Sequence, residues 1–478
     1  MNSTHPARFL SCLALAASVT STPLSLPFKQ VGEIRPRPAK ESRNDQWRLG
    51  CETLDRDYID FETYKEHVGP LGIRIARLQG GWAKCEKQKG VYDFAWLDRV
   101  VDYLIANGVE PALETNYGNP IYPGGGTVDL AAGFPTSEEG LAGWDAWVDA
   151  ITKHFKGRVR IWMMWNEPDL WPRDGSPQKT EAQVAAFNVR TAKIVHRNVP
   201  GAKVGALSLA FNNTQYFENC LKAMGKDVEL FDTVVYHGYM PAPESSYESV
   251  EQMKAILAKY NPKARLWQGE NGCPSETAHC FALSRIPWTE TSQAKWDMRR
   301  MLGDLGHDVY SSVFTICDFN HKGREINRKG LIRANAQKKM TGIKPAYYSV
   351  RNVATVFDET LSRVADSSAE KGFGTADKTV TTYHYVKEGK DPLFVFWEHT
   401  DKADKKFERP KDSYETRPVE FTYTGKPLKD PVFVDLLSGR IYAFPAKAQV
   451  VEGGRVRFLD VPVYDSPCVL TERRAVMR

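Results

Sequence analysis

The sequence lacks the features that mark several large classes of protein. Its 478 residues carry a formal net charge of only +5, and no dense block of lysine and arginine occurs. A nucleic-acid-binding surface is therefore not expected. No apolar run reaches the roughly 18 residues of a membrane-spanning helix, so no membrane span is expected. HExxH, CxxC, GxGxxG and P-loop patterns are also missing, and we predict no metal and no cofactor.

Cysteine is scarce as well, with 8 residues in the chain. Cys12 lies in an N-terminal apolar run, and removal of that run would leave an odd number. An odd number argues against a complete disulfide framework. Cys273 and Cys280 are close enough in sequence to pair in an oxidising compartment, and the sequence leaves this question open.

Residues 1–22 have the layout of a signal peptide. Arg8 precedes an apolar run that begins at Phe9, and small residues follow, with cleavage expected around Ser18 to Ser21. The run is too short for a stable membrane helix. A disordered leader is the alternative. We expect a secreted or periplasmic protein, and we expect residues 23–46, which are rich in proline and charge, to form a linker.

From Trp47 onward, short apolar strands alternate with helical patterns. Strands that alternate with helices imply βα units and a parallel sheet. Eight units within residues 47–360 predict a (β/α)₈ TIM barrel. The expected strands are 47–51, 73–79, 110–115, 159–165, 203–209, 233–236, 265–269 and 309–317. The expected helices lie within 92–108, 137–157, 180–201, 246–262, 292–308 and 344–358.

The pattern changes near Lys378. Short alternating strands are separated there by turns of glycine, proline, aspartate and lysine. This predicts an antiparallel β-sandwich, which we place at residues 361–478. Trp397 is one of a few aromatic residues that look exposed in this segment, and they form no clear glycan-binding face. We therefore expect the sandwich to support the barrel.

Two glutamates follow predicted strands of the barrel. Glu167 follows the fourth strand in "RVRIWMMWNEPDLWP", and Glu270 follows the seventh in "RLWQGENG". The active site of a (β/α)₈ barrel lies at the carboxyl ends of its strands, so both side chains are expected at one mouth. Glycoside hydrolysis requires two such carboxyl groups. One protonates the leaving oxygen, and the other attacks the anomeric carbon or activates water.

Each glutamate also has a structural explanation. Asn166 could cap a helix, with Pro168 in its first turn and Glu167 near the positive end of the helix dipole. A lone glutamate after a strand, such as Glu270, is more often a solvated loop residue. The occurrence of both, at the ends of the fourth and seventh strands, favours catalysis.

With these motifs, residues 47–358 resemble the large clan of retaining (β/α)₈ glycoside hydrolases, clan A. "YDFAWLDRVVDYLIANGVEPALETNYGNP", "WNEPD" and the barrel-plus-sandwich plan look most like family 39, which includes xylosidases and iduronidases; family 5 is the next most similar. The resemblance implies that Glu167 is the acid/base and Glu270 the nucleophile. It also implies that Asn166 binds the 2-hydroxyl of the sugar.

The resemblance implies further contacts. Arg77 resembles a second-strand arginine that keeps the nucleophile ionised, a role compatible with a structural ion pair. His237 and Tyr239 resemble a pair at the sixth strand, in which the tyrosine hydrogen-bonds the nucleophile; a structural histidine is the alternative. Loops after the second, third and fourth strands add candidate substrate contacts that packing would also explain: Trp82, Glu114, Asn116, Tyr117 and Trp171.

Two departures from the clan pattern bear on the substrate. Many members place a tryptophan at the end of the eighth strand, where this chain reads "FTICDFNHKGRE", and "GENG" replaces "TEW" or "TEF" around the nucleophile. We expect Asp318 to contact a sugar with an unusual substituent or orientation. The predicted function is retaining hydrolysis of an oligo- or polysaccharide by double displacement. An inactive carbohydrate-binding protein and a transglycosylase are the alternatives, and the sugar and the oligomeric state stay open.

Overall fold

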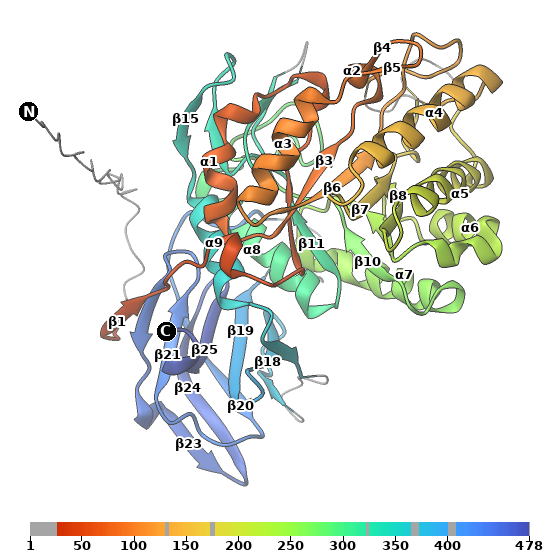
Figure 1. Ribbon diagram of the computed structural model, residues 1–478. Coiled ribbons are helices and arrows are strands. Elements are labelled where there is room, and N and C mark those ends of the chain that lie inside the picture. Colours follow the sequence, from red (N-terminus) through yellow and green to blue (C-terminus); the bar gives the residue numbers. More distant parts are fainter. Residues whose placement is uncertain are drawn as a thin grey trace, which may run out of the picture.

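The computed structural model describes residues 26–129, 133–172, 177–321, 325–364, 372–399 and 408–477. Figure 1 shows a barrel surrounded by helices, with a β-sandwich packed below it. The predicted signal peptide and Cys12 lie outside the described residues. Within the described ranges, no helix has the length and apolar character that crossing a bilayer requires.

Eight parallel strands close into the predicted barrel. Their neighbour order is β10-β11-β2-β3-β6-β7-β8-β9. Each coincides with an expected strand to within a few residues, and the eighth ends at Val313 rather than Cys317. The strands are β2 (Trp47–Gly50), β3 (Ile75–Gln79), β6 (Glu110–Thr115), β7 (Ile161–Met164), β8 (Lys203–Leu209), β9 (Thr233–Tyr236), β10 (Arg265–Gln268) and β11 (Tyr310–Val313).

Helices cover the outside of the barrel. Their starts follow local capping rules: Ser137 accepts a hydrogen bond from the N–H of Gly140, and Thr180 and Thr289 each form a capping box. The first βα connection has only the one-turn helix α1 (Lys65–Val68) in place of a long helix. The long helices are α3 (Ala95–Ala106), α4 (Glu138–His154), α5 (Glu181–Asn198), α6 (Thr214–Met224), α7 (Tyr247–Tyr260), α8 (Glu290–Gly306) and α9 (Pro345–Val356).

Short elements decorate the carboxyl-end loops. They are α2 (Trp82–Cys85) and three two-stranded sheets: β4 (Glu86–Gln88) with β5 (Val91–Tyr92), β12 (Phe319–Asn320) with β13 (Ile326–Asn327), and β14 (Ile332–Ala334) with β15 (Met340–Ile343).

Alternation along the strands decides which side chains enter the barrel. Residues two apart share a face, so Ile75, Arg77 and Gln79 all lie on the same side of β3. Near the amino ends of the strands, the guanidinium of Arg48 stacks 3.9 Å from the ring of Trp267. Ile75 precedes Arg77 and Gln79 on β3, so these two polar residues lie above an apolar plug, towards the carboxyl ends of the strands. The plug consists of Ile75, Ala112, Ile161, Met163, Val235 and Trp267.

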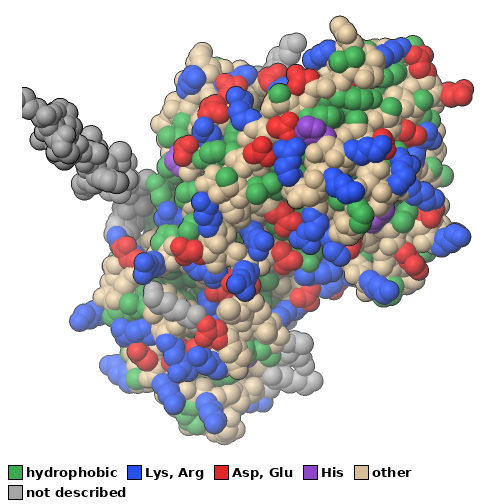
Figure 2. All heavy atoms as spheres, viewed as in Figure 1, with side chains coloured by type: hydrophobic (Ala, Val, Ile, Leu, Met, Phe, Trp, Pro, Cys, Tyr) green, Lys and Arg blue, Asp and Glu red, His purple; other side chains and the backbone are tan. Residues whose placement is uncertain are grey.

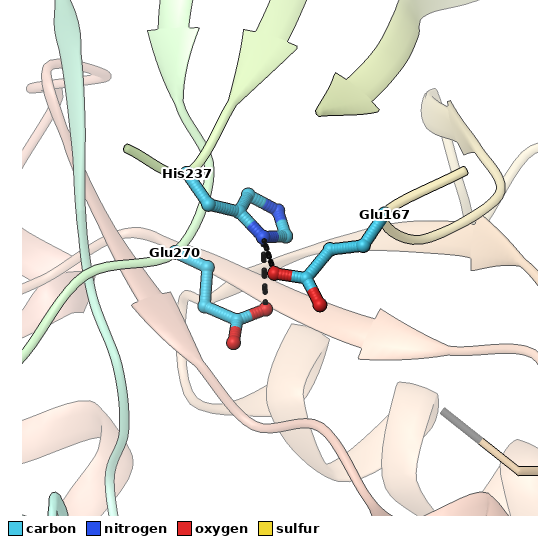
Figure 3. A group of neighbouring side chains, drawn as sticks. All are labelled: Glu167, His237 and Glu270. Atoms are coloured by element: carbon cyan, nitrogen blue, oxygen red, sulfur yellow. Dashed lines mark hydrogen bonds and ion pairs between the residues drawn. The ribbon is translucent and has the colours of Figure 1, made fainter. Parts of the chain in front are cut away.

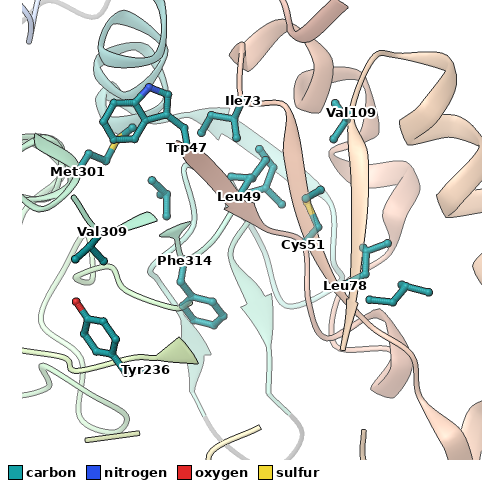
Figure 4. Close-up of a cluster of buried hydrophobic side chains, with 14 of the residues drawn as sticks. Trp47, Leu49, Cys51, Ile73, Leu78, Val109, Tyr236, Met301, Val309 and Phe314 are labelled. Carbon is teal, nitrogen blue, oxygen red and sulfur yellow. The ribbon is translucent and has the colours of Figure 1, made fainter. Parts of the chain in front are cut away.

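The opposite faces of the strands pack against the helices. Figure 4 shows part of this layer, where Trp47 of β2 lies near Met301 of α8, and Leu49 of β2 and Leu78 of β3 belong to the same cluster. These side chains are fully or almost fully buried. Burial of apolar surface on this scale is the main stabilisation of the barrel, and it fixes the strand ends that carry the polar residues.

Two antiparallel sheets form the sandwich. One has the order β1-β22-β21-β25-β19-β18-β16 and the other β17-β20-β24-β23, with a phenylalanine-rich core between them. The strands are β16 (Leu361–Arg363), β17 (Phe373–Gly374), β18 (Val380–Lys387), β19 (Asp391–Glu398), β20 (Arg417–Tyr423), β21 (Pro431–Asp435), β22 (Arg440–Ala443), β23 (Gln449–Glu452), β24 (Arg455–Val463) and β25 (Cys468–Glu472).

One strand of the sandwich comes from the segment expected to be a linker. β1 (Gln30–Glu33) pairs antiparallel with β22 at the edge of the larger sheet. Prolines at positions 36 and 38 end this strand, because proline lacks the N–H that a ladder needs. The linker prediction for residues 23–46 was therefore wrong for this stretch.

The sandwich docks on the barrel through buried polar contacts. Glu244 forms a two-point ion pair with Arg299 of α8, at 2.8 and 2.7 Å, and accepts a 2.7 Å hydrogen bond from Nε1 of Trp397. Trp397 is fully buried at this junction, so its expected exposure was wrong. Lys295 on the same helix donates to Asp465 of the sandwich at 2.6 Å.

The cysteines and the surface charges agree with the composition of the sequence. All cysteines of the described residues are free, and Cys273 and Cys280 are not paired. Figure 2 shows cationic and anionic side chains intermixed over the face seen in Figure 1, in line with the small net charge.

Candidate active site

A cavity of about 430 Å³ opens at the carboxyl ends of the barrel strands. Its position is where (β/α)₈ enzymes place their active sites. Five predicted site residues line it, namely Tyr117, Asn166, Glu167, Tyr239 and Glu270. The other lining residues had no predicted role: Glu52, Thr53, Arg56, Gln79, Leu170, Ala210, Phe211, Phe281, Ala282, Leu283, Phe314, Phe319, His321, Asn327 and Lys329.

Glu167 is held in an unusual backbone conformation. Its φ is +51°, in the left-handed region that side chains other than glycine rarely adopt. The N–H of Glu167 donates to the carbonyl of Ser208 on β8 at 2.9 Å, which ties the turn to the next strand. Residues 166–172 form turns and bends, and α5 begins only at Glu181, so the helix-cap explanation is wrong. Backbone strain of this kind clusters at functional sites.

Glu167, His237 and Glu270 converge from three strand ends, as Figure 3 shows. Nδ1 of His237 lies 2.9 Å from Oε1 of Glu167 and 3.5 Å from Oε2 of Glu270. One carboxylate oxygen of Glu167 lies within 4.8 Å of one oxygen of Glu270. Burial lowers the pKa of His237, but Glu270 and Glu167 outweigh this effect, so its pKa lies above the usual value.

Glu270 is surrounded by groups that favour its ionised form. Nη1 of Arg77 donates to its Oε2 at 3.0 Å, and the hydroxyl of Tyr239 donates to its Oε1 at 3.1 Å. Burial raises the pKa of Glu270, but His237, Arg77 and the Tyr239 hydroxyl outweigh burial, and the pKa lies below its usual value. A carboxylate kept ionised in this way is suited to act as a nucleophile.

Arg77 organises the floor of the site without lining the cavity. It is fully buried, and its Nη2 donates to Glu114 at 2.5 Å and to Oδ1 of Asn166 at 2.6 Å. Its Nη1 donates to Glu52 at 2.7 Å as well as to Glu270. Three carboxylates and one amide are thus fixed by a single guanidinium.

Glu52 is a site residue that the sequence did not suggest. It follows β2 by two positions, lines the cavity and is 4% exposed. Burial raises its pKa to about 7, with Arg77 opposing this rise and Glu270 adding to it. "CETLD" matches no motif; the only signal was an acidic residue just beyond the first barrel strand.

The amide of Asn166 has a fixed orientation. Its Oδ1 accepts from Arg77, and its Nδ2 donates to the hydroxyl of Tyr117 at 2.9 Å. One N–H of the amide remains for a ligand. Tyr117 lines the cavity, whereas Asn116 is buried and donates to Glu114 at 2.7 Å. Glu114 and Asn116 therefore support Arg77 and do not line the cavity.

Two predicted contacts lie away from the cavity. Trp82 is fully buried, donates to Glu86 and stacks on Tyr122, so it belongs to the core. Asp318 is fully buried and bound to Lys344 at 2.6 Å and to Arg328 at 3.2 Å. The geometry gives Asp318 a structural ion pair in place of the expected sugar contact. Phe319 and His321, its near neighbours in sequence, do line the cavity.

Lys329 is a buried cation in the cavity wall. Its Nζ donates to the carbonyl of Ala282 at 2.6 Å and lies 5.7 Å from the ring centre of Tyr239. Burial lowers its pKa to about 8. The same hydrogen bond holds the 281–283 loop, in which Phe281 and Leu283 have positive φ values of 71° and 63°.

The trio of Glu167, His237 and Glu270 is also the group of described residues whose ligand atoms lie close enough to hold a metal ion. A cation there would compete with Arg77 and Tyr239 for Glu270 and with Glu167 for His237. Because of these existing hydrogen bonds, the trio is better suited to proton transfer than to metal binding.

Comparisons with known proteins find glycoside hydrolases among the relatives. A family model described as beta-galactosidase, of glycoside hydrolase family 42, matches residues 57–123. A beta-xylosidase of Geobacillus stearothermophilus is 26% identical over 211 residues, which are 40% of this chain. The match spans 41% of the length of that relative.

Solved structures match nearly the whole chain. A family 39 glycoside hydrolase from Bacteroides cellulosilyticus superposes with a TM-score of 0.63 at 18% identity, over 91% of this chain and 81% of that one. The chain has the same fold as that enzyme, a (β/α)₈ barrel with a β-sandwich. A monomeric beta-xylosidase from Caulobacter crescentus (TM-score 0.57, 16% identity, 93% and 97% covered) and a family 30 endoxylanase from Clostridium papyrosolvens (0.58, 13%, 94% and 98%) share this fold. The resemblance predicted from the sequence is thus confirmed for the fold.

Proposed function

We propose that this clan A chain is a retaining glycoside hydrolase with Glu167 as acid/base and Glu270 as nucleophile. The observation that carries the proposal is the closeness of the two carboxylates, whose nearest oxygens lie within 4.8 Å. Retaining enzymes hold their carboxyl groups about 5–5.5 Å apart, whereas inverting enzymes need about 6.5–9.5 Å to admit a water. The spacing supports direct attack by Glu270.

The reaction has two steps. In the first, a carboxylate oxygen of Glu270 bonds to the anomeric carbon while the glycosidic C–O bond breaks, and Glu167 gives its proton to the leaving oxygen. In the second, Glu167 takes a proton from water, the water oxygen bonds to the anomeric carbon, and the ester to Glu270 breaks. Arg77 and Tyr239 hold Glu270 ionised and aimed for the first step.

Azide rescue tests the assignment of the two glutamates. Glu270→Ala should lose measurable hydrolysis, and added azide should restore turnover to a glycosyl azide of inverted configuration. Glu167→Ala should lower turnover roughly 10²–10⁴-fold for poor leaving groups, with azide giving a product of retained configuration. Turnover unaffected by either substitution would refute the proposal, as would inverted product from the wild type.

Xylosides are the first substrates to test, because beta-xylosidases are among the relatives. A panel of aryl glycosides and polysaccharides should accompany them. Glycan binding without turnover over the whole panel would favour an inactive binding protein. Transfer to an added sugar acceptor in preference to water would favour a transglycosylase.

We also propose export through the N-terminal segment. The supporting pattern is the cation, apolar run and small residues of positions 1–22. Fractionation of expressing cells, with mass spectrometry of the mature N-terminus, tests this. Cleavage near residues 18–21 is expected, and an intact N-terminus in the cytosolic fraction would contradict it.

A further inference from the structure

Two large aromatic side chains are exposed on the loops that follow β7 and β8. Among the Trp and Phe residues that the structure describes, Trp171 at 73% and Phe211 at 53% are the exposed ones. Large aromatic residues are usually buried, because they carry much apolar surface. Exposed aromatic side chains on the loops after β7 and β8, one of them in the cavity wall, point to a ligand.

The acid/base turn holds both residues in place. Asp169 accepts hydrogen bonds from the N–H of Ala210 at 2.7 Å and from the N–H of Phe211 at 3.2 Å. Asp169 lies two positions after Glu167 and two before Trp171. The loops after β7 and β8 therefore form one unit, and Phe211 cannot move far from the acid/base.

Phe211 lines the same cavity as Glu167, together with Leu170. The groups around Glu270 differ in character, because Tyr239, Arg77 and His237 surround it with polar contacts. Apolar residues line the cavity on two sides: Phe281, Leu283, Phe314 and Phe319 on the loops after β10 and β11, and Leu170 and Phe211 on the loops after β7 and β8. In double displacement the leaving group departs from the oxygen that Glu167 protonates, so it lies on the side of Leu170 and Phe211.

We propose that Phe211, with Leu170, forms a leaving-group subsite that binds a ring-bearing group through its flat apolar face. This inference rests on the proposed hydrolase function and names part of its substrate. The chemistry that fits is a second sugar ring, which presents C–H bonds on its face, or an aryl ring. A small leaving group without a ring gains nothing from this subsite.

Three substrates that share one glycone test the subsite. They are an aryl glycoside, a disaccharide and a glycosyl fluoride, whose leaving group is a single atom. Phe211→Ala should lower kcat/KM roughly three- to tenfold for the aryl glycoside and the disaccharide, the range of one aromatic stacking contact. It should leave kcat/KM for the fluoride unchanged within about twofold. Phe211→Trp should restore the loss.

Ile105→Ala is the matched control, because Ile105 is an exposed apolar residue on the distant helix α3. It should change none of the three values. Equal losses on all three substrates in Phe211→Ala would overturn the subsite, as would no loss on any. A loss confined to the aryl glycoside or the disaccharide identifies which ring the subsite accepts. If the wild type fails to hydrolyse even the fluorides of several glycones, the hydrolase function itself fails, and the subsite falls with it.

Discussion

Glu52 and Glu270 accept hydrogen bonds from the same nitrogen of Arg77. Nη1 donates to Oε1 of Glu52 at 2.7 Å and to Oε2 of Glu270 at 3.0 Å. The two carboxyl groups therefore titrate as an interacting pair. The pKa of Glu270 lies below its usual value, and burial brings that of Glu52 to about 7. Near pH 6 the pair thus carries one proton, which resides on Glu52.

Replacement of Glu52 by glutamine should make stability less dependent on pH. The folded-state pKa of about 7 exceeds the unfolded value of about 4.5, so the native state binds the extra proton. Wild-type stability therefore falls as pH rises from about 4.5 to 7, whereas the Glu52→Gln variant lacks this loss. Between pH 4 and pH 8, the free energy of unfolding of the variant should therefore rise by about 3 kcal/mol relative to that of the wild type.

Urea unfolding of both proteins at pH 4, 6 and 8 measures this difference. The acidic limb of the activity profile should stay in place, because Glu52 is already protonated where Glu270 titrates. A constant stability difference over this pH range would contradict the assignment of the proton to Glu52.

Tyr239→Phe should move the acidic limb of kcat/KM to higher pH. The lost hydroxyl donates to Oε1 of Glu270 at 3.1 Å and lowers the pKa of that carboxyl. A hydrogen bond to a charged group contributes about 1.5–3 kcal/mol, so kcat/KM at neutral pH should fall at least about tenfold. Tyr236→Phe is the control, because that hydroxyl contacts Arg300 on the outer side of the barrel. If the acidic limb of kcat/KM shifted in both variants, the cause would be a general loosening of β9 and not the lost hydrogen bond to Glu270.

His237→Gln should impair substrates according to their leaving groups. Nδ1 of His237 lies 2.9 Å from Oε1 of Glu167 and fixes the carboxyl that we propose protonates the leaving oxygen. Alkyl glycosides need that proton, so their kcat should fall by about 10²-fold. Dinitrophenyl glycosides leave without protonation and should be affected much less. Comparison of kcat for the two substrate types measures the effect, and equal losses would show that His237 acts on Glu270 or on the fold.

The barrel was predictable because its signals are local and repeated. Each of the eight strands is an apolar run with a helix pattern or a turn after it, and the positions of Glu167 and Glu270 at strand ends follow from that regularity. Helix α6 was missed although its N-cap, Asn213, is a good one. Its buried residues Phe217, Cys220, Leu221 and Met224 have the i, i+3, i+4, i+7 spacing of a helix, so the sequence did contain a signal for it.

The residues missed or misplaced depend on tertiary contacts. Glu52 matters because Arg77 lies within reach, and Phe211 matters because Asp169 anchors it; neither partner is near in sequence. Asp318 was assigned to the substrate because it follows a strand, but Lys344, 26 positions away, neutralises it. β1 was taken for linker because an edge strand of four residues carries no pattern of its own.

Glu244→Gln should destabilise the junction between barrel and sandwich. Arg299 and Trp397 both bind this carboxylate; burial raises its pKa, but Arg299 outweighs burial and brings the pKa to about 2. The ionised Glu244 carboxylate therefore adds to the free energy of unfolding above about pH 4.5, and this contribution is lost as pH falls towards 2. At pH 7 the variant should lose about 3 kcal/mol of unfolding free energy, and less than half of that at pH 3.

Glu420→Gln is the matched control, because Glu420 forms a two-point pair with Arg457 at the surface of the sandwich. Solvent screens that pair, so little stability should be lost at either pH. Unfolding curves at pH 7 and pH 3 compare the variants. Equal losses for both glutamates would mean that the sandwich is not anchored through Glu244. A selective loss for Glu244, with activity falling as the sandwich detaches, would establish that the sandwich supports the catalytic barrel.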